Sequence, residues 1–163
     1  MKTEIKEILE AVQAGKLSAA DALLAIKKEP FEDIGYAKID LHRSIRQGMP
    51  EVIYGAGKTA EQIIGIAERM KLNGQHTVLI TRLSPESAEQ IAARHPMAYH
   101  ADAKVGVIGP IPPASGIGKI VVATGGTSNI PVAEEAALTA EAHGNEVVRL
   151  YDVGVAGLHR LLA

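Results

Sequence analysis

The segment from residue 119 to residue 151 most constrains the fold, because it reads as strand, loop, helix and strand in one continuous run. Lys119–Ala123 is mostly apolar and β-branched, Gly125–Asn129 is a polar glycine loop, and Pro131–His143 has the length of a helix. Glu146–Tyr151 supplies a second strand. Two strands joined in this way form a βαβ unit with parallel strands and a right-handed crossover. The pattern therefore predicts an α/β protein.

A similar alternation of strands and helices precedes this unit. Val52–Tyr54 and Thr77–Thr81 are short apolar strands, and the second suits a buried parallel position. Thr59–Met70 has one apolar helical face and is stopped by the Asn-Gly pair that follows it. Ser84–Arg94 begins with a capping serine and a first-turn proline, so it predicts a second helix. Met97–His100 can form another strand.

The N-terminal residues predict a helical hairpin. Apolar side chains recur at helical spacing over residues 3–14, and Gly15 can end that helix in a left-handed conformation. Ser18 caps a second helix, and the hairpin closes near Lys27–Pro30. A short strand is expected at Tyr36–Ile39.

These patterns divide the chain into four segments. Residues 1–30 form the helical hairpin, residues 31–105 a small α/β domain, and residues 106–118 a linker within a stretch rich in proline and glycine. Residues 119–163 form the first βαβ unit of a flavodoxin-like parallel sheet. Such sheets have about five or six strands, so either these two strands join the sheet of the preceding domain or the polypeptide is a fragment of a longer one.

Composition excludes several classes of function. The net charge is −2 and the chain has one Phe and no Trp, so no basic, aromatic surface for nucleic acid is expected. There is no cysteine, which excludes disulfides, thiolate–zinc sites and thiol nucleophiles within this chain. No apolar run reaches the roughly 20 residues of a membrane helix, and the N-terminus lacks a signal core. The expected location is the cytoplasm, with no membrane partner.

The glycine loop of the βαβ unit is the first candidate site. Gly125 and Gly126 let the backbone approach a ligand closely, and the amides that follow favour an anion together with the helix dipole. Thr127 and Ser128 add hydroxyl donors. A plain glycine turn, with Ser128 or Asn129 as the helix N-cap, is the equally weighted alternative. The loop lacks the pattern G-x-G-x-x-G, so it does not predict a Rossmann dinucleotide site.

A second glycine loop, Gly55–Thr59, ends in Gly-Lys-Thr like a P-loop. The P-loop requires a glycine where this chain has Val52, so a Walker A site is rejected. Lys58 and the amide of Thr59 keep an anion-binding interpretation, beside the alternative of a capping loop.

His159 and Arg160 form the third candidate, at the start of the helix that follows the second strand of the βαβ unit. This is the carboxyl edge of the sheet, where such folds bind ligands. A histidine there can transfer protons near neutral pH, and an arginine can bind a phosphate with two hydrogen bonds. A surface pair without a function is the alternative. No metal site is expected, because the other histidines show no convincing metal-ligand spacing.

Three long motifs resemble those of the LarB family, the pyridinium-3,5-biscarboxylic acid mononucleotide synthases of nickel-pincer cofactor biosynthesis. They are Pro50–Thr59, Thr124–Ala136 and Tyr151–Arg160, and they occur in the family's order. The resemblance runs from the helical hairpin to the last residue. The C-terminal domain of that family is similar to the purine-pathway aminoimidazole ribonucleotide carboxylase/mutase.

The resemblance implies roles for the candidate residues. In the carboxylase/mutase a Gly-Ser-x-Ser-Asp loop holds the nucleotide phosphate and ribose, and Gly126–Asn129 takes its place here. A Ser-x-His-Arg segment supplies a catalytic histidine and a phosphate-binding arginine, which correspond to His159 and Arg160. Asn129 departs from the usual aspartate, so it lacks the charge that an acid/base role requires.

The family's reaction, as the resemblance implies it, carboxylates the pyridinium ring of nicotinic acid adenine dinucleotide twice, with carbon dioxide or bicarbonate as carbon source. Hydrolysis of the phosphoanhydride then releases AMP. A cysteine first adds to the ring, because thiolate addition turns a poorly nucleophilic cation into an electron-rich dihydropyridine. That cysteine lies in a later C-terminal segment of the family. This chain has none, so the resemblance predicts a truncated member that is inactive alone.

The expected partner is a nucleotide substrate, with no cofactor within this chain and Mg²⁺ as a candidate ion. Association with another chain is expected, because an incomplete sheet exposes an edge strand and an apolar face. The resemblance implies a homo-oligomer. Two alternative functions stay open: a purine-pathway aminoimidazole ribonucleotide carboxylase/mutase, and a nucleotide-binding or assembly module without catalysis.

Overall fold

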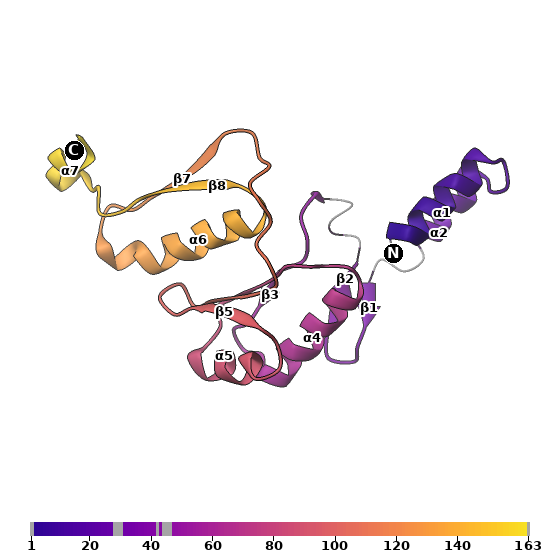
Figure 1. Cartoon of the computed structure of the whole chain (residues 1–163), viewed down its shortest axis with the longest axis horizontal. Coiled ribbons are helices and arrows are strands. Elements are labelled where there is room, and N and C mark those ends of the chain that lie inside the picture. The colour runs from indigo at the N-terminus through magenta and orange to yellow at the C-terminus, as the bar shows by residue number, and fades with distance from the viewer. Residues whose placement is uncertain (1, 28–30, 42, 44–46, 163) are drawn as a thin grey trace.

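The structure is a computed structural model that describes residues 2–27, 31–41, 43 and 47–162. Within this part of the chain the strands form a two-stranded sheet β1-β2, a four-stranded sheet in the order β3-β4-β6-β5, and a two-stranded sheet β7-β8. Helices and strands are mixed along the chain (Figure 1). The predicted α/β class is confirmed. None of the described helices is long and apolar enough to cross a membrane.

The N-terminal hairpin consists of α1 (Lys2–Gln13) and α2 (Ala19–Lys27). Gly15 has a φ of +68° between them, as the left-handed helix end requires. The Oγ of Ser18 accepts a hydrogen bond from the Asp21 amide at 3.0 Å, which confirms the predicted cap of the second helix. Residues 28–30, where the hairpin was expected to close, lie outside the described residues.

A β-hairpin follows, formed by β1 (Phe31–Asp33) and β2 (Lys38–Asp40). A carboxylate oxygen of Asp33 accepts a hydrogen bond from the Gly35 amide at 2.8 Å, which stabilises the turn between them. The prediction of a single strand at Tyr36–Ile39 was therefore incomplete. A three-residue strand with two acidic residues has too short and too polar a pattern to be recognised by periodicity.

The four-stranded sheet contains three predicted strands: β3 (Ile53–Tyr54), β4 (Val78–Thr81) and β5 (Met97–His100). Its fourth strand, β6 (Val105–Ile108), was missed, because three of its residues were assigned to the linker predicted at 106–118. β3 pairs with β4 in parallel, whereas β6 pairs with both β4 and β5 in antiparallel fashion. The sheet is mixed, and all four residues of β6 are buried.

The two helices of this domain begin as predicted. Thr59 caps α4 (Ala60–Leu72) with a capping box, in which its side chain accepts from the Gln62 amide and the Gln62 side chain accepts from the Thr59 amide. Ser84 caps α5 (Pro85–Ala92), whose first residue is the proline.

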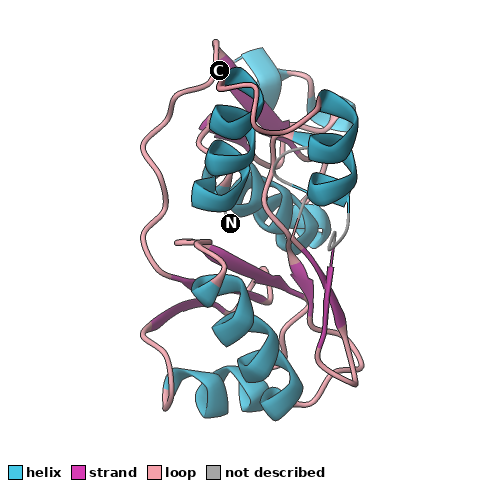
Figure 2. Cartoon of the chain, turned by 90° about the vertical axis from the view of Figure 1, so that its right-hand side faces the viewer, coloured by secondary structure: helices cyan, strands magenta, loops and turns pink. Residues whose placement is uncertain are grey.

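The four-stranded sheet is covered by helices on both faces. Val78 and Ile80 of β4 belong to the core that α4 and α5 close, whereas Leu79, on the opposite face, packs in a second core with Leu138 of α6 (Ile130–Ala142). Figure 2 shows helices both above and below the strands of this sheet. This alternation is the period of two that a sheet with two buried faces requires.

The C-terminal unit is the predicted βαβ crossover. β7 (Lys119–Ala123) and β8 (Glu146–Leu150) pair in parallel, and α6 connects them. They do not join the four-stranded sheet, so that alternative is wrong: α6 lies between the two sheets (Figure 1). A 3-10 turn η2 (Val155–Gly157) and the short helix α7 (His159–Leu162) follow β8.

Candidate functional site

The candidate site lies at the carboxyl edge of β7 and β8, where hydrogen bonds join the two outgoing loops. The Thr124 amide donates to the Leu150 carbonyl at 3.0 Å, and the Thr124 carbonyl accepts from the Val153 amide at 2.9 Å. The Oγ1 of Thr124 accepts from the Asp152 amide at 3.1 Å. Thr124 is 6% exposed, so these bonds are shielded from water. The loop after β7 is thereby held against the loop after β8.

Two glycines of these loops differ in the space around them. A Cβ on Gly154 would overlap the carbonyl oxygen of Gly125, so only glycine fits at Gly154 without a shift of the backbone. A Cβ on Gly126, in contrast, would meet no atom within 4 Å. The side of Gly126 is therefore open, as close approach of a ligand requires.

The loop leads directly into the first turn of α6. Thr127–Asn129 forms a 3-10 turn η1, in which the Asn129 amide donates to the Gly126 carbonyl at 3.2 Å. Asn129 occupies the N-cap position of α6, but its side chain makes no capping hydrogen bond. In this part of the described chain the side chains of Thr127, Ser128 and Asn129 are exposed and bond to no other residue. The Ile130 amide donates to the Thr127 carbonyl, and Pro131 has no amide N–H. The amides of Gly126, Thr127 and Ser128 make no hydrogen bond in the described structure, so they can donate to an anion.

Arg160 is held beside this loop by the loop after β8. Its Nη1 lies 2.7 Å from a carboxylate oxygen of Asp152, and its Nη2 donates to the Gly154 carbonyl at 3.2 Å. Asp152 has a φ of +60°, which is uncommon outside glycine and is fixed here by the bond to Thr124. Because Gly154 contacts Gly125, the guanidinium lies next to the glycine loop. The structure thus places Arg160 close to Gly125, at the carboxyl edge of the two strands.

His159 begins α7 and is exposed. Its ring lies over Gly157, because a Cβ built there would meet the His159 Cε1 at 3.2 Å and the Arg160 Nε at 3.0 Å. His159 makes no hydrogen bond with the described residues. Its proposed catalytic role stays a prediction.

Lys58 lies apart from this cluster, in the loop between β3 and α4. Its Nζ donates to the Tyr54 carbonyl at 2.9 Å, and its amide donates to the Gly55 carbonyl at 3.1 Å. No hydrogen bond or ion pair joins Lys58 to Gly125–Asn129 in the described structure. The expectation that the Thr59 amide binds an anion is wrong, because the Gln62 side chain already accepts its hydrogen bond. The capping-loop alternative holds for that amide, and anion binding by Lys58 stays a prediction.

Charged residues of α6 connect the site to both sheets, and the sequence did not reveal these contacts. On one side, Arg149 of β8 bonds to Glu134 at 3.1 Å and to Glu141 at 2.5 Å. The hydrogen bond to Glu141, with that to Glu134, raises the pKa of Arg149. Tyr151 donates to Glu134 at 2.8 Å, and burial is the main cause of its raised pKa. These groups are 15 or more residues from Glu134 in sequence, so spacing alone gives no signal of their contact.

On the other side of α6, Glu135 accepts from Arg82, which follows β4. The Nε of Arg82 lies 2.8 Å from one carboxylate oxygen of Glu135 and 3.1 Å from the other. This hydrogen bond raises the pKa of Arg82. Glu134 and Glu135 therefore tie α6 to the two-stranded and the four-stranded sheet, respectively.

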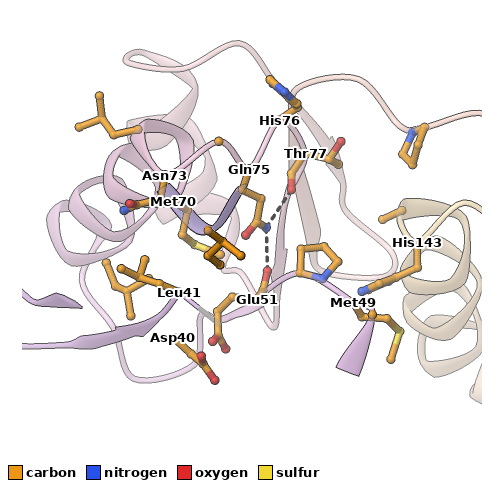
Figure 3. Close-up of a pocket in the computed structure, with 18 residues that line it drawn as sticks. Asp40, Leu41, Met49, Glu51, Met70, Asn73, Gln75, His76, Thr77 and His143 are labelled. Carbon is orange, nitrogen blue, oxygen red and sulfur yellow. Dashed lines mark hydrogen bonds between the residues drawn. The ribbon is translucent and has the colours of Figure 1, made fainter. Parts of the chain in front are cut away.

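A cavity of about 610 Å³ lies at the opposite end of α6 (Figure 3). Gln75 projects into this region and donates through Nε2 to the carbonyls of Glu51 and Thr77 at 2.8 and 2.9 Å. His143, just past the end of α6, also lines it. None of the predicted site residues contributes to this cavity. Within the described residues, no group of three or more histidine or acidic side chains is placed to hold a metal ion.

The comparisons with known proteins agree with the resemblance seen in the motifs. Residues 31–110 match the family described as the LarB/PurE-like N-terminal domain. The match ends two residues after β6, so it contains the whole four-stranded sheet. A LarB/PurE-like domain indicates a carboxylase/mutase-like protein.

The chain is also similar to an uncharacterized protein of Methanocaldococcus jannaschii. The two are 35% identical over 173 aligned residues, which cover 99% of this chain and 66% of that protein. The chain thus spans just under two thirds of the length of this relative. The match over residues 31–110 supports membership of the chain in the LarB/PurE-like family.

Proposed function

We propose that this chain binds a nucleotide phosphate through Gly125–Asn129 and Arg160, and that it serves the LarB-type carboxylation of nicotinic acid adenine dinucleotide with release of AMP. One observation carries the proposal: the bonds of Thr124 and Asp152 hold Arg160 beside the uncapped start of α6. The guanidinium of Arg160 and the unbonded amides of Gly126–Ser128 are the kinds of donor that bind a phosphate, and this supports the proposal.

Arg160 keeps donors for a ligand. A guanidinium has five N–H groups, and Asp152 and Gly154 accept from two of its nitrogens. Asp152 thus orients the group without using all of its donors. The exposed Thr127 and Ser128 hydroxyls add further donors at the same loop.

His159 is proposed as the proton-transfer group of this site. It precedes Arg160 in α7 and is exposed to a ligand held there. An imidazole exchanges protons near neutral pH, which suits a step in which a ring carbon loses a proton after carboxylation.

The pyridinium ring itself requires a nucleophile before it can attack carbon dioxide. In the LarB reaction a cysteine thiolate adds to the ring, and this chain contains no cysteine. We therefore expect the 163-residue polypeptide to bind the dinucleotide without turnover. Carbon dioxide or bicarbonate as the carbon source, Mg²⁺ at the pyrophosphate, and a cytoplasmic location belong to the same proposal.

A homo-oligomer is also proposed. α6 covers one face of the β7-β8 sheet, and no element lies on its other face in Figure 1. Arg149 bonds to Glu134 of α6, so the neighbouring Leu150 and the strand residue Val121 point to the other face of the sheet, where they are 40% and 56% exposed. An exposed apolar face of this kind favours association with another chain. Analytical ultracentrifugation of the purified chain at several concentrations tests the proposed homo-oligomer. A monomer at every concentration would contradict self-association.

Nucleotide binding is tested by isothermal titration calorimetry with AMP and with nicotinic acid adenine dinucleotide. Replacing Arg160 by Gln removes a charge-assisted hydrogen bond, so both affinities are expected to fall about 10- to 100-fold. Arg94→Gln is the control, because this arginine is exposed and lies past the end of α5, away from the glycine loop. If Arg160→Gln binds both nucleotides as the unaltered chain does, the site is not where we place it.

The lack of a cysteine also favours a second candidate function, a nucleotide-binding or assembly module that has no catalytic step of its own. Dicarboxylated product at ordinary turnover, formed by this chain with the dinucleotide and bicarbonate, would exclude the module. A purine-pathway carboxylase/mutase would instead show preferential binding of aminoimidazole ribonucleotide over the dinucleotide in the same titration.

A further inference from the structure

The carboxyl edge of the four-stranded sheet places a second arginine near the candidate site. Arg82 directly follows β4 and contacts Glu135, which lies in the second turn of α6. Glu135 is six residues after Asn129, or about 9 Å along the helix axis at about 1.5 Å per residue. Arg82 therefore lies toward the same end of α6 as the glycine loop. In Figure 1 the turn between β5 and β6, whose Lys104 bonds to the residue after Arg82, lies beneath that half of α6.

The backbone of Arg82 is fixed in an uncommon conformation. Its φ is +53°, in the left-handed region where glycine or asparagine is usual. The residues on either side are anchored: the Thr81 carbonyl accepts from the Gly55 amide at 2.7 Å, and the Leu83 amide donates to the Lys104 carbonyl at 2.8 Å. Leu83 is 1% exposed. Backbone conformations of this kind are frequent at ligand sites. The conformation of Arg82 therefore also favours a ligand-binding role.

The guanidinium of Arg82 is oriented by Glu135 and keeps hydrogen-bond donors for a ligand. Glu135 accepts from its Nε, and its two terminal nitrogens make no hydrogen bond to the described residues. The side chain is 50% exposed. A guanidinium held through Nε presents its two terminal nitrogens to the solvent as a pair, the geometry that binds a carboxylate or a phosphate with two parallel hydrogen bonds.

We propose that Arg82 binds a second anionic group, a phosphate or a carboxylate, of the ligand whose first phosphate is held by Gly125–Asn129. Glu135 is then a positioning residue that aims the guanidinium. The inference rests on the proposed function, because it requires a ligand at the glycine loop. It means that the domain of residues 31–110 contributes directly to ligand binding, from the sheet edge that faces the start of α6.

The test is calorimetry of the whole chain with three ligands: AMP, ADP and nicotinic acid adenine dinucleotide. Arg82→Gln is expected to weaken dinucleotide binding about tenfold and to leave AMP binding within about twofold. Arg82→Lys keeps the charge without the paired donors, so a smaller loss is expected. Arg69→Gln is the matched control, because Arg69 is 46% exposed and also pairs with a glutamate of another element, Glu32.

The pattern of losses identifies the anionic group. Weaker binding of both ADP and the dinucleotide means that Arg82 holds the second phosphate, whereas a loss for the dinucleotide alone means that it holds the pyridine carboxylate. If Arg82→Gln binds all three ligands normally while Arg160→Gln binds them weakly, this inference is wrong and the proposed function stands. If Arg160→Gln also binds them normally, both are wrong.

Discussion

Gly154 and Gly126 lie in neighbouring loops of the candidate site but have opposite tolerances for a side chain. Gly154→Ala places a methyl group against the Gly125 carbonyl, so the two loops must separate. Overpacking of this kind costs about 1–3 kcal/mol. Gly126→Ala meets open space in an extended conformation and is expected to change stability by less than about 0.5 kcal/mol. Urea denaturation of both variants measures the difference; equal stabilities would contradict the close packing of the two loops.

At the residue scale, hydrogen bonds between near neighbours could be predicted from the sequence, whereas those between distant residues could not. The caps at Ser18, Thr59 and Ser84 were predictable, because a capping side chain acts on amides two or three residues away. The hydrogen-bond partners of Arg160 could not be predicted, because the contacts with Asp152 and Gly154 depend on the conformation of the loop after β8. The positive φ of Asp152 likewise depends on a bond to Thr124, 28 residues earlier.

At the scale of elements, α6 contributes to the stability of the preceding domain. Leu138 is 4% exposed and packs with Leu79, Val105 and Val107 of the four-stranded sheet. Leu138→Ala removes that contact and leaves a cavity, so a loss of about 2–5 kcal/mol in unfolding free energy is expected. Leu72→Ala is the control, because Leu72 ends α4 and is 74% exposed. A loss for Leu138→Ala no greater than for Leu72→Ala would mean that α6 does not pack on that sheet.

The elements that were predicted are those with a local signal. β7, α6 and β8 were found within a residue or two, because their apolar runs are bounded by glycine and proline. β6 was missed for the opposite reason: it has four residues, contains Gly106, and adjoins a proline-rich stretch. Its strand character comes from pairing with β4 and β5. The side-chain ends of Met97 and Leu83 lie over Gly106 and would have to shift for a larger residue.

For the molecule as a whole, α6 is the element that two sheets share. Its acidic side chains bond to Arg149 on one side and to Arg82 on the other, while its first turn follows the glycine loop. Arg82 follows the carboxyl end of β4, and Arg160 is held by the loop after β8. Both arginines therefore lie toward the same end of α6. Separate motifs in the sequence predicted the glycine loop and Arg160, but not this arrangement, because the contact between Arg82 and Glu135 spans 53 residues.

The most direct test of the account is an NMR titration of the ¹⁵N-labelled chain with AMP, followed through its backbone amide resonances. Phosphate binding at the start of α6 predicts the largest shifts for the amides of Gly126–Ile130 and for the side-chain Nε of Arg160. Resonances of Gln75 and His143, in the cavity at the other end of α6, are expected to stay unchanged. Shifts centred on Gln75 and His143, with none at Gly126–Ile130, would contradict a phosphate site at the glycine loop.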